Sequence, residues 1–192
     1  YGPWRWLPRW DARFTAAYFD HSGLYAFGRQ PEALYWNCGQ LAMALRLLVD
    51  TPPLVAALER FGPLYEEAMA RRFAWRLGMD PVDVETARRL VAAAEDFMKG
   101  ADVGPDAFFF ACRAARNNPG GELESIIRAH ARPDSLDHSL WSEAEAPSLL
   151  IDEVETIWSA IDRDDDWTPL HDKVSAIRRL GQALGEPPAL LA

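Results

Sequence analysis

The sequence QPEALYWNCGQLAMALRLLVD, residues 30–50, sets the helical character of the chain. Pro31 suits the first turn of a helix, where its missing N–H group would have no intrahelical partner. The residues that then recur at steps of three and four, with a single step of one, are Leu34, Asn37, Cys38, Leu41, Leu45 and Leu48. This spacing places them on one helical face and predicts a helix from about residue 31 to residue 49.

Helical signals continue towards the C-terminus. Thr51-Pro52-Pro53 begins a second helix reaching residue 77, which Gly62-Pro63 should kink or split and Gly78 should end. Further helices are predicted over about 80–98, 105–116, 122–130, 139–161 with a break at Pro147, and 169–185. No stretch alternates with the period of two that is typical of a strand. We therefore predict an all-α fold with about seven helices.

The residues before this stretch have a different texture. Residues 1–30 begin YGPWRWLPRW, are rich in aromatic side chains and show no sustained period. Asp20, His21 and Ser22 are adjacent, with Gly23 and Gly28 nearby. An irregular segment this long is uncommon inside a compact domain and is usually functional where it occurs. Its aromatic content predicts that it packs against other parts of the protein.

Composition narrows the class of protein. The 192 residues carry 29 acidic and 20 basic side chains, a net charge of -9, which argues against a general nucleic-acid-binding protein. No run of 18 apolar residues is present, so we expect no membrane-spanning segment. Cys38 and Cys112 fall in no metal-binding or redox motif, and we interpret them as free thiols of a reducing compartment. The expected location is the cytoplasm.

Familiar catalytic motifs are absent from the sequence. There is no GxSxG, no phosphate-binding P-loop and no GxGxxG, and the four histidines form no HExxH pair. The acidic run DRDDD at 162–166 is followed by Trp167 and Lys173 where a calcium-binding EF-hand needs glycine and glutamate. We therefore predict no metal site and no catalytic residue within this chain, and we interpret the acidic run as a solvated loop.

The opening segment resembles the activation segment of the selenoprotein O family of kinase-like protein adenylyltransferases. That family has a D-Y-G-P-aromatic-x-aromatic-L motif, then D-H-x-G-R-Y-x-F, x-Q-P and a helix bearing W-N. The matching residues are Tyr1-Gly2-Pro3, Trp4, Trp6, Leu7, Asp11, Phe14, Asp20-His21, Gly23, Tyr25, Phe27, Gln30-Pro31, Trp36-Asn37, Leu41-Ala42 and Leu45. Leu24 replaces the usual arginine, and Arg29 stands where asparagine is common. The resemblance is strong over the first 48 residues, and a weaker similarity to the family is found from Ala101 to Arg113.

The resemblance implies a division of the chain and a chemistry. Residues 1–30 would be an activation-segment-like loop, 31–130 the helical part of a kinase-like C-lobe and 131–192 a C-terminal helical extension. The implied reaction moves AMP from ATP, with Mg²⁺ or Mn²⁺, to Ser, Thr or Tyr of protein substrates. The residues expected to form the segment are Tyr1, Gly2, Pro3, Asp20, His21, Tyr25 and Gln30.

The metal-binding aspartate of the family motif would precede Tyr1. We therefore expect an N-terminal kinase-like half outside this chain, and no activity from the chain alone. Two alternatives remain open at this point. One is a stand-alone all-α protein-interaction module without catalysis, and the other is phosphoryl rather than AMP transfer.

Overall fold

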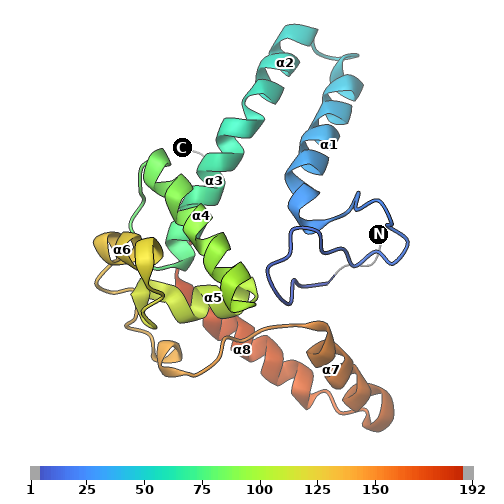
Figure 1. The fold of residues 1–192 in the computed structure, drawn as a ribbon. Coiled ribbons are helices and arrows are strands. Elements are labelled where there is room, and N and C mark those ends of the chain that lie inside the picture. The colour runs from blue at the N-terminus through green and yellow to red at the C-terminus, as the bar shows by residue number, and fades with distance from the viewer. Residues whose placement is uncertain (1–4, 188–192) are drawn as a thin grey trace. The chain divides into compact units, whose positions relative to one another are not determined.

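The computed structural model describes residues 5–187, and it confirms the all-α prediction (Figure 1). The helices found in these residues are α1 (Gln30–Leu45), α2 (Thr51–Glu59), α3 (Phe61–Arg76), α4 (Val84–Ala101), α5 (Pro105–Cys112), α6 (Gly121–His130), α7 (Ile151–Asp164) and α8 (Thr168–Leu184). Short 3-10 turns lie at Phe27–Arg29, Arg113–Ala115 and Ser139–Ser142. The described residues contain one isolated β-bridge, between Met79 and Ala131, and no named strand.

The described chain forms two compact units. The first comprises residues 11–69, and the second comprises residues 5–10 together with 70–187. Helix α3 begins in the first unit and ends in the second. In the first unit α1 packs beside α2 and α3, where Tyr35 lies 5.5 Å from Phe61 and Phe61 stacks on Tyr65 at 6.0 Å between ring centroids.

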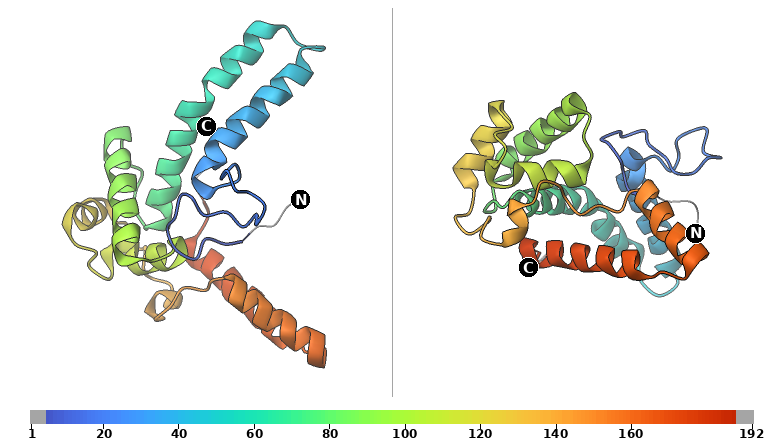
Figure 2. Two further views of the ribbon diagram at one scale, coloured as in Figure 1. Left: turned by 45° about the vertical axis from the view of Figure 1, so that its right-hand side comes forward. Right: turned by 90° about the horizontal axis from the view of Figure 1, so that it is seen from below.

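The second unit holds most of the buried apolar side chains. Phe108, Phe109 and Phe110 on α5 are all buried, and Phe109 meets Phe73 of α3 edge-on at 5.0 Å. Other core residues come from several helices and turns, among them Leu77, Leu90, Met98, Ile127 and Leu140. Helices α7 and α8 lie side by side in both views of Figure 2, tied by a 2.6 Å ion pair between Lys173 and Glu153.

A buried arginine joins three parts of this unit. Arg113 is 1% exposed, and its guanidinium donates to the carbonyl oxygens of Trp75 and Arg76 at the end of α3, both at 2.9 Å. It also donates to the Ser135 carbonyl oxygen at 2.8 Å and lies 4.5 Å from the centre of the Trp141 ring. The last carbonyls of a helix lack intrahelical donors, so Arg113 caps α3 with a side chain from outside the helix.

Several helix ends agree with the prediction. The helix predicted over 51–77 divides at Arg60, next to Gly62-Pro63, and Gly78 follows its end with a φ of +71°. The predicted helices 122–130 and 169–185 match α6 and α8 to within one residue at each end.

Four predicted helices have different bounds. The helix predicted over 31–49 ends at Leu45, and the one predicted over 105–116 ends at Cys112, where a 3-10 turn with Ala114 in the left-handed region interrupts it. α4 starts at Val84 rather than residue 80, because the Asp83 carboxylate accepts the Thr86 N–H at 2.9 Å and the Thr86 hydroxyl at 2.7 Å, capping the helix there. It ends at Ala101, capped by Asp102 in the left-handed region. The predicted helix 139–161 is wrong over 143–150, where the chain is non-helical before Leu150 caps α7.

Candidate functional site

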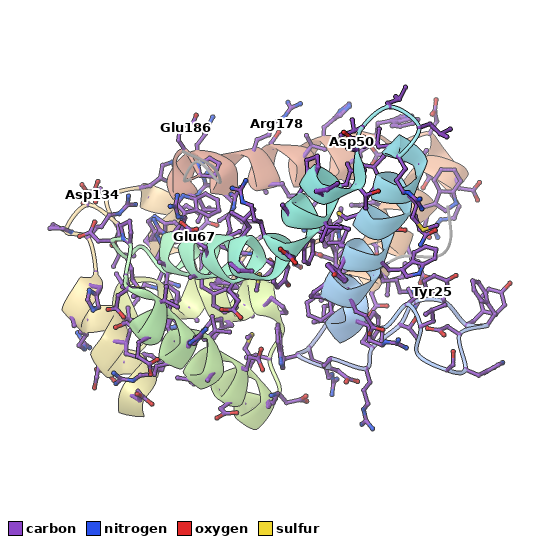
Figure 3. The ribbon with its side chains drawn as sticks, turned by 90° about the horizontal axis from the view of Figure 1, so that it is seen from above. Tyr25, Asp50, Glu67, Asp134, Arg178 and Glu186 are labelled. Atoms are coloured by element: carbon purple, nitrogen blue, oxygen red, sulfur yellow. The ribbon has the colours of Figure 1, made fainter. Side chains whose placement is uncertain are left out.

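The predicted site residues fall into two groups. Tyr1, Gly2 and Pro3 lie outside the described residues. Asp20, His21 and Tyr25 lie in the loop of residues 11–29 that leads into α1, and Gln30 is the first residue of α1. Figure 3 shows the labelled Tyr25 on this loop, with its ring pointing away from the ribbon.

The Asp20 carboxylate organises the tip of this loop. Its two oxygens accept the backbone N–H groups of Leu24 and Tyr25, each at 2.8 Å, and the Ser22 hydroxyl lies 3.4 Å away. Desolvation disfavours the charged carboxylate, but the hydrogen bonds from Tyr25, Leu24 and Ser22 outweigh it and hold the pKa of Asp20 below its ordinary value. Asp20 is therefore a turn-forming residue whose anionic form is favoured.

The base of the loop is closed by backbone hydrogen bonds. The Phe27 N–H donates to the Phe14 carbonyl at 2.8 Å, and the Gly28 N–H donates to the Ala12 carbonyl at 2.8 Å. A Cβ atom at Gly28 would lie 2.9 Å from the Ala12 Cβ and 3.0 Å from the Ala12 carbonyl oxygen. Only glycine fits this approach without displacement, so the two arms of the loop meet here.

Aromatic rings are exposed at the tip of this loop. Tyr18 is 86% exposed, and its ring meets Phe19 edge-on at 5.3 Å; Phe19 in turn meets Tyr25 edge-on at 6.3 Å. His21 is also exposed beside them. Amphipathic rings with polar tips are well suited to contact a polypeptide. We call Tyr18, Phe19, His21 and Tyr25 the aromatic tip.

Residues 7–10 dock on the loop between α4 and α5, within the second unit. Arg9 donates to both oxygens of Asp102, at 2.9 and 3.2 Å, and the Trp10 N–H donates to the Val103 carbonyl at 3.1 Å. A Cβ at Gly104 would lie 2.6 Å from the Pro8 carbonyl oxygen. The sequence analysis missed this docking because its partners lie more than ninety positions apart, and no local pattern links them.

Arg29, one of the departures from the family pattern, has a local partner. Its guanidinium forms two hydrogen bonds with the Glu32 carboxylate, at 2.8 and 2.9 Å. These bonds raise the pKa of Arg29 and lower that of Glu32. Leu24, where the family has arginine, is 50% exposed. Arg29 therefore supports the start of α1 rather than replacing the family's cation.

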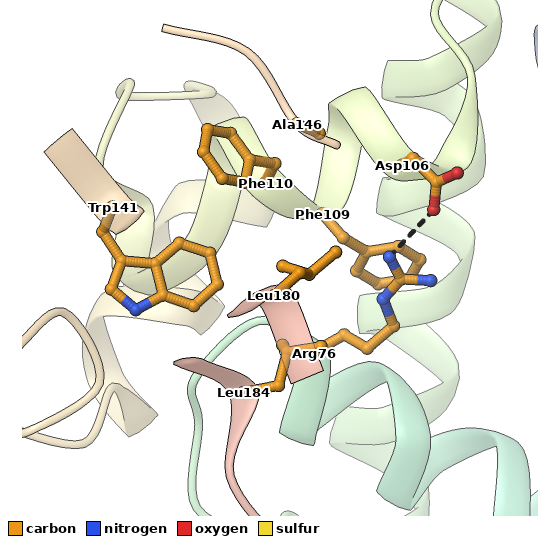
Figure 4. A pocket seen from close by; sticks show the side chains of 8 residues that line it. All are labelled: Arg76, Asp106, Phe109, Phe110, Trp141, Ala146, Leu180 and Leu184. Atoms are coloured by element: carbon orange, nitrogen blue, oxygen red, sulfur yellow. Dashed lines mark hydrogen bonds and ion pairs between the residues drawn. The ribbon is translucent and has the colours of Figure 1, made fainter. Parts of the chain in front are cut away.

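The described residues bring no set of metal-ligating side chains together. In the range 5–187 no three His, Cys, Asp or Glu side chains gather as metal ligands. A hollow in the second unit accommodates about one water molecule. Figure 4 shows its lining residues, Arg76, Asp106, Phe109, Phe110, Trp141, Ala146, Leu180 and Leu184, with Arg76 paired to Asp106 at 3.1 Å. These groups do not fit ATP and its metal ion, so we assign no step to them.

None of the helices in the described part is long and apolar enough to cross a membrane.

Comparison with known proteins identifies the family. The sequence model of the family described as Protein adenylyltransferase SelO matches residues 1–146. A Protein nucleotidyltransferase YdiU of Gloeobacter violaceus is 28% identical over 203 residues, covering 93% of this chain and 42% of that relative. One of Pseudomonas paraeruginosa is 38% identical over 147 residues, covering 75% of this chain and 29% of that relative.

A third relative with the same name, from Cytophaga hutchinsonii, is 39% identical over 112 residues, covering 57% of this chain and 21% of its own length. The chain thus spans less than half the length of the curated relatives it matches. The family match includes the whole loop before α1 and continues through α1 to α6. The chain belongs to the SelO family of protein adenylyltransferases.

Proposed function

We propose that the protein to which this chain belongs transfers AMP from ATP to Ser, Thr or Tyr hydroxyl groups of protein substrates. In this reaction the acceptor oxygen bonds to the α-phosphorus and pyrophosphate leaves. The observation that carries the proposal is the family match over residues 1–146, which includes the loop organised by Asp20. The relatives' name, protein nucleotidyltransferase, supports it.

Within that function this chain would supply the surface that meets the acceptor protein. Asp20 holds the backbone of residues 22–25 in one conformation, which fixes where the Tyr25 ring lies. A fixed acceptor-binding surface raises the rate by orienting the hydroxyl group towards the nucleotide. ATP, with Mg²⁺ or Mn²⁺, would be the cosubstrate of the complete protein, and the metal-binding aspartate of the family motif would precede Tyr1.

The test compares ATP labelled at the α-phosphate with ATP labelled at the γ-phosphate. The complete protein and this chain alone are each incubated with Mg²⁺ or Mn²⁺ and a mixture of acceptor proteins. Transfer of the α-label by the complete protein supports AMP transfer, and transfer of the γ-label alone would replace it with phosphorylation. We expect no transfer of either label by the chain alone. No transfer by the complete protein under any metal condition would favour the interaction-module alternative.

A matched pair of variants tests the role of the loop. Asp20→Asn replaces one accepting oxygen with an NH₂ group that faces a backbone N–H, and we expect kcat/KM for AMP transfer to fall by about tenfold. Asp50→Asn makes the same change in charge at the start of α2, where the side chain makes no capping hydrogen bond, and should leave activity unchanged. Equal activity of the two variants would remove Asp20 from the function.

A further inference from the structure

The connection of residues 102–104, between α4 and α5, departs from the usual residue preferences at helix ends. α4 ends at Asp102, whose φ of +52° and ψ of +42° lie in the left-handed region. Glycine normally occupies such a position, because a Cβ atom is strained there. α5 begins after Gly104, which makes no side-chain capping hydrogen bond. Serine, threonine, asparagine and aspartate lead at that position, because their side-chain oxygens accept hydrogen bonds from the first N–H groups of the helix.

The aspartate at position 102 is explained by its contact with residues 7–10, which we call the docked segment. Its two carboxylate oxygens accept hydrogen bonds from Nη1 of Arg9, at 2.9 and 3.2 Å, and glycine has no group that could do so. The two side chains are 66% and 63% exposed. An ion pair this exposed adds little to folding stability, so stability does not account for an aspartate at a strained position.

Val103 and Gly104 also contact the docked segment. The Val103 carbonyl accepts the Trp10 N–H at 3.1 Å. A Cβ atom at Gly104 would lie 2.6 Å from the Pro8 carbonyl oxygen, so a larger residue would push the docked segment away. Three consecutive residues thus each contact one stretch of chain more than ninety positions away. Positions at which a sequence departs from local preferences are commonly functional.

The docked segment leads directly into the loop of residues 11–29. Trp10 stands two positions before Ala12, whose carbonyl accepts the Gly28 N–H and closes the base of that loop. Backbone hydrogen bonds within the loop set its internal shape. The docked segment, which belongs to the second unit, holds the point at which the loop begins.

We propose that Asp102 and Arg9 are positioning residues for AMP transfer. Their ion pair holds the entrance of the loop, so that the aromatic tip presents the acceptor hydroxyl group in one orientation. A positioned acceptor reacts faster, because less orientational freedom is lost on the way to the transition state. Aspartate is kept at position 102 for this role, at a cost in helix stability. The proposal rests on the function proposed above, and both residues act through the loop rather than on the reacting atoms.

The experiment measures two rates in the complete protein: transfer of the α-label from ATP to acceptor proteins, and cleavage by chymotrypsin within residues 5–29. Chymotrypsin cleaves after aromatic residues, so a substitution of Arg9 does not alter its sites. Asp102→Asn keeps the size of the side chain and removes its charge. We expect kcat for AMP transfer to fall by about fivefold, with the KM for ATP unchanged.

Cleavage of Asp102→Asn should be at least about threefold faster, because the docked segment opens more often. Asp96→Asn makes the same change at an exposed position of α4 and should alter neither rate. Normal transfer by Asp102→Asn, or unchanged cleavage, would overturn the proposal.

Two further variants separate positioning from stability. Asp102→Gly removes the ion pair and relieves the backbone strain, so the Tm should stay equal or rise by up to about 4 °C while kcat falls as in Asp102→Asn. Arg9→Met should lower kcat to the same extent. The double variant Arg9→Met/Asp102→Asn should lose no more activity than either single variant, because both changes break one contact.

The outcomes distinguish this proposal from the function on which it rests. A lower Tm in Asp102→Gly would mean that Asp102 serves the fold, and additive losses in the double variant would mean that Asp102 and Arg9 act separately. Either result refutes the positioning role. Equal transfer by every variant refutes that role alone and leaves AMP transfer standing. Absence of transfer by the unsubstituted complete protein contradicts the proposed function, and the positioning role fails with it.

Discussion

Replacing Arg113 by methionine is expected to destabilise the chain by about 3 kcal/mol, because the side chain supplies the donors that cap α3. Arg113 is buried, and its three carbonyl acceptors are those of Trp75, Arg76 and Ser135. Methionine has a similar length and fills much of the same space, so the substitution removes the hydrogen bonds without opening a large cavity.

The magnitude follows from which acceptors lose their only donor. The Trp75 carbonyl also accepts the Gly78 N–H at 3.1 Å and keeps that bond, whereas within residues 5–187 no second donor is found for the Arg76 or Ser135 carbonyl. The buried Ser135 carbonyl and the partly buried Arg76 carbonyl, each left without a donor, cost about 1–3 kcal/mol each. Burial of the charge works in the other direction: desolvation lowers the pKa of Arg113 to about 10, and methionine escapes that penalty. The expected net loss of unfolding free energy is therefore near the lower end of the range given by adding the two carbonyl costs.

The assay is urea unfolding followed by tryptophan fluorescence at neutral pH. Arg116→Met is the matched control, because Arg116 lies over the Phe110 ring and donates to one carbonyl, that of Trp141. We expect that control to cost about 1 kcal/mol. The capping argument would be contradicted if the unfolding free energy of Arg113→Met lay within about 1 kcal/mol of that of the unsubstituted chain, or if Arg113→Met were no less stable than Arg116→Met.

Three further predictions concern the docked segment of residues 7–10, the buried thiol of Cys112 and the last two helices. Gly104→Ala should release residues 7–10 and increase proteolysis there, since its Cβ would lie 2.6 Å from the Pro8 carbonyl oxygen; Gly100→Ala, which meets no atom within 4 Å, should instead stabilise α4 by about 0.5–1 kcal/mol. The folded-state pKa of Cys112, about 11 against an ordinary 9.0, means that the unfolded chain loses the thiol proton first, so stability falls as pH rises from 9 to 11. Between pH 8 and pH 10 the unfolding free energy of the unsubstituted chain should fall by about 1 kcal/mol because of this thiol, and that contribution should be absent from Cys112→Ala. Lys173→Met should cost about 0.5–1 kcal/mol at pH 7 by removing the partner of Glu153. Desolvation raises the pKa of Glu153, but the hydrogen bonds from Lys173, Ser148 and Leu150 outweigh it, so the pKa lies below its ordinary value. The stability that the ion pair contributes is therefore lost as pH falls through the Glu153 pKa, and the unfolding free energies of the unsubstituted chain and of Lys173→Met should converge in acid.

The helical character of the chain could be predicted because it depends on local patterns. The period of three and four, the Pro31 start and the Gly78 stop each act within one or two turns, and α1, α6 and α8 appear close to where those signals place them. The start of α4 was misplaced because two signals compete: Pro81 suits a first turn, but Asp83 bonds Thr86 and caps the helix two residues later. The non-helical residues 143–150 show that the break expected at Pro147 extends well to its N-terminal side.

The candidate site was predictable only where its contacts are local. Asp20 and its donors lie within five residues, which is the range over which an aspartate typically forms a turn. The bond from Arg9 to Asp102 and the hydrogen bond from Arg113 to the Ser135 carbonyl join segments that the fold brings together. Such contacts require knowledge of the tertiary structure, and a single sequence carries no spacing rule for them.

The second unit depends on contacts between distant segments, whereas the loop before α1 depends on local contacts, so we expect substitutions to affect the two differently. In residues 70–187, contacts between distant segments bury four phenylalanines and an arginine, so single substitutions there should reduce cooperative stability. In the loop of residues 11–29, the backbone hydrogen bonds join residues of the same loop, and two alanines supply its buried side chains. Such a segment has little stability of its own, and its order should depend on turn-forming residues such as Asp20. A change at Asp20 should therefore alter the conformation of the aromatic tip while leaving the unfolding transition of the second unit intact.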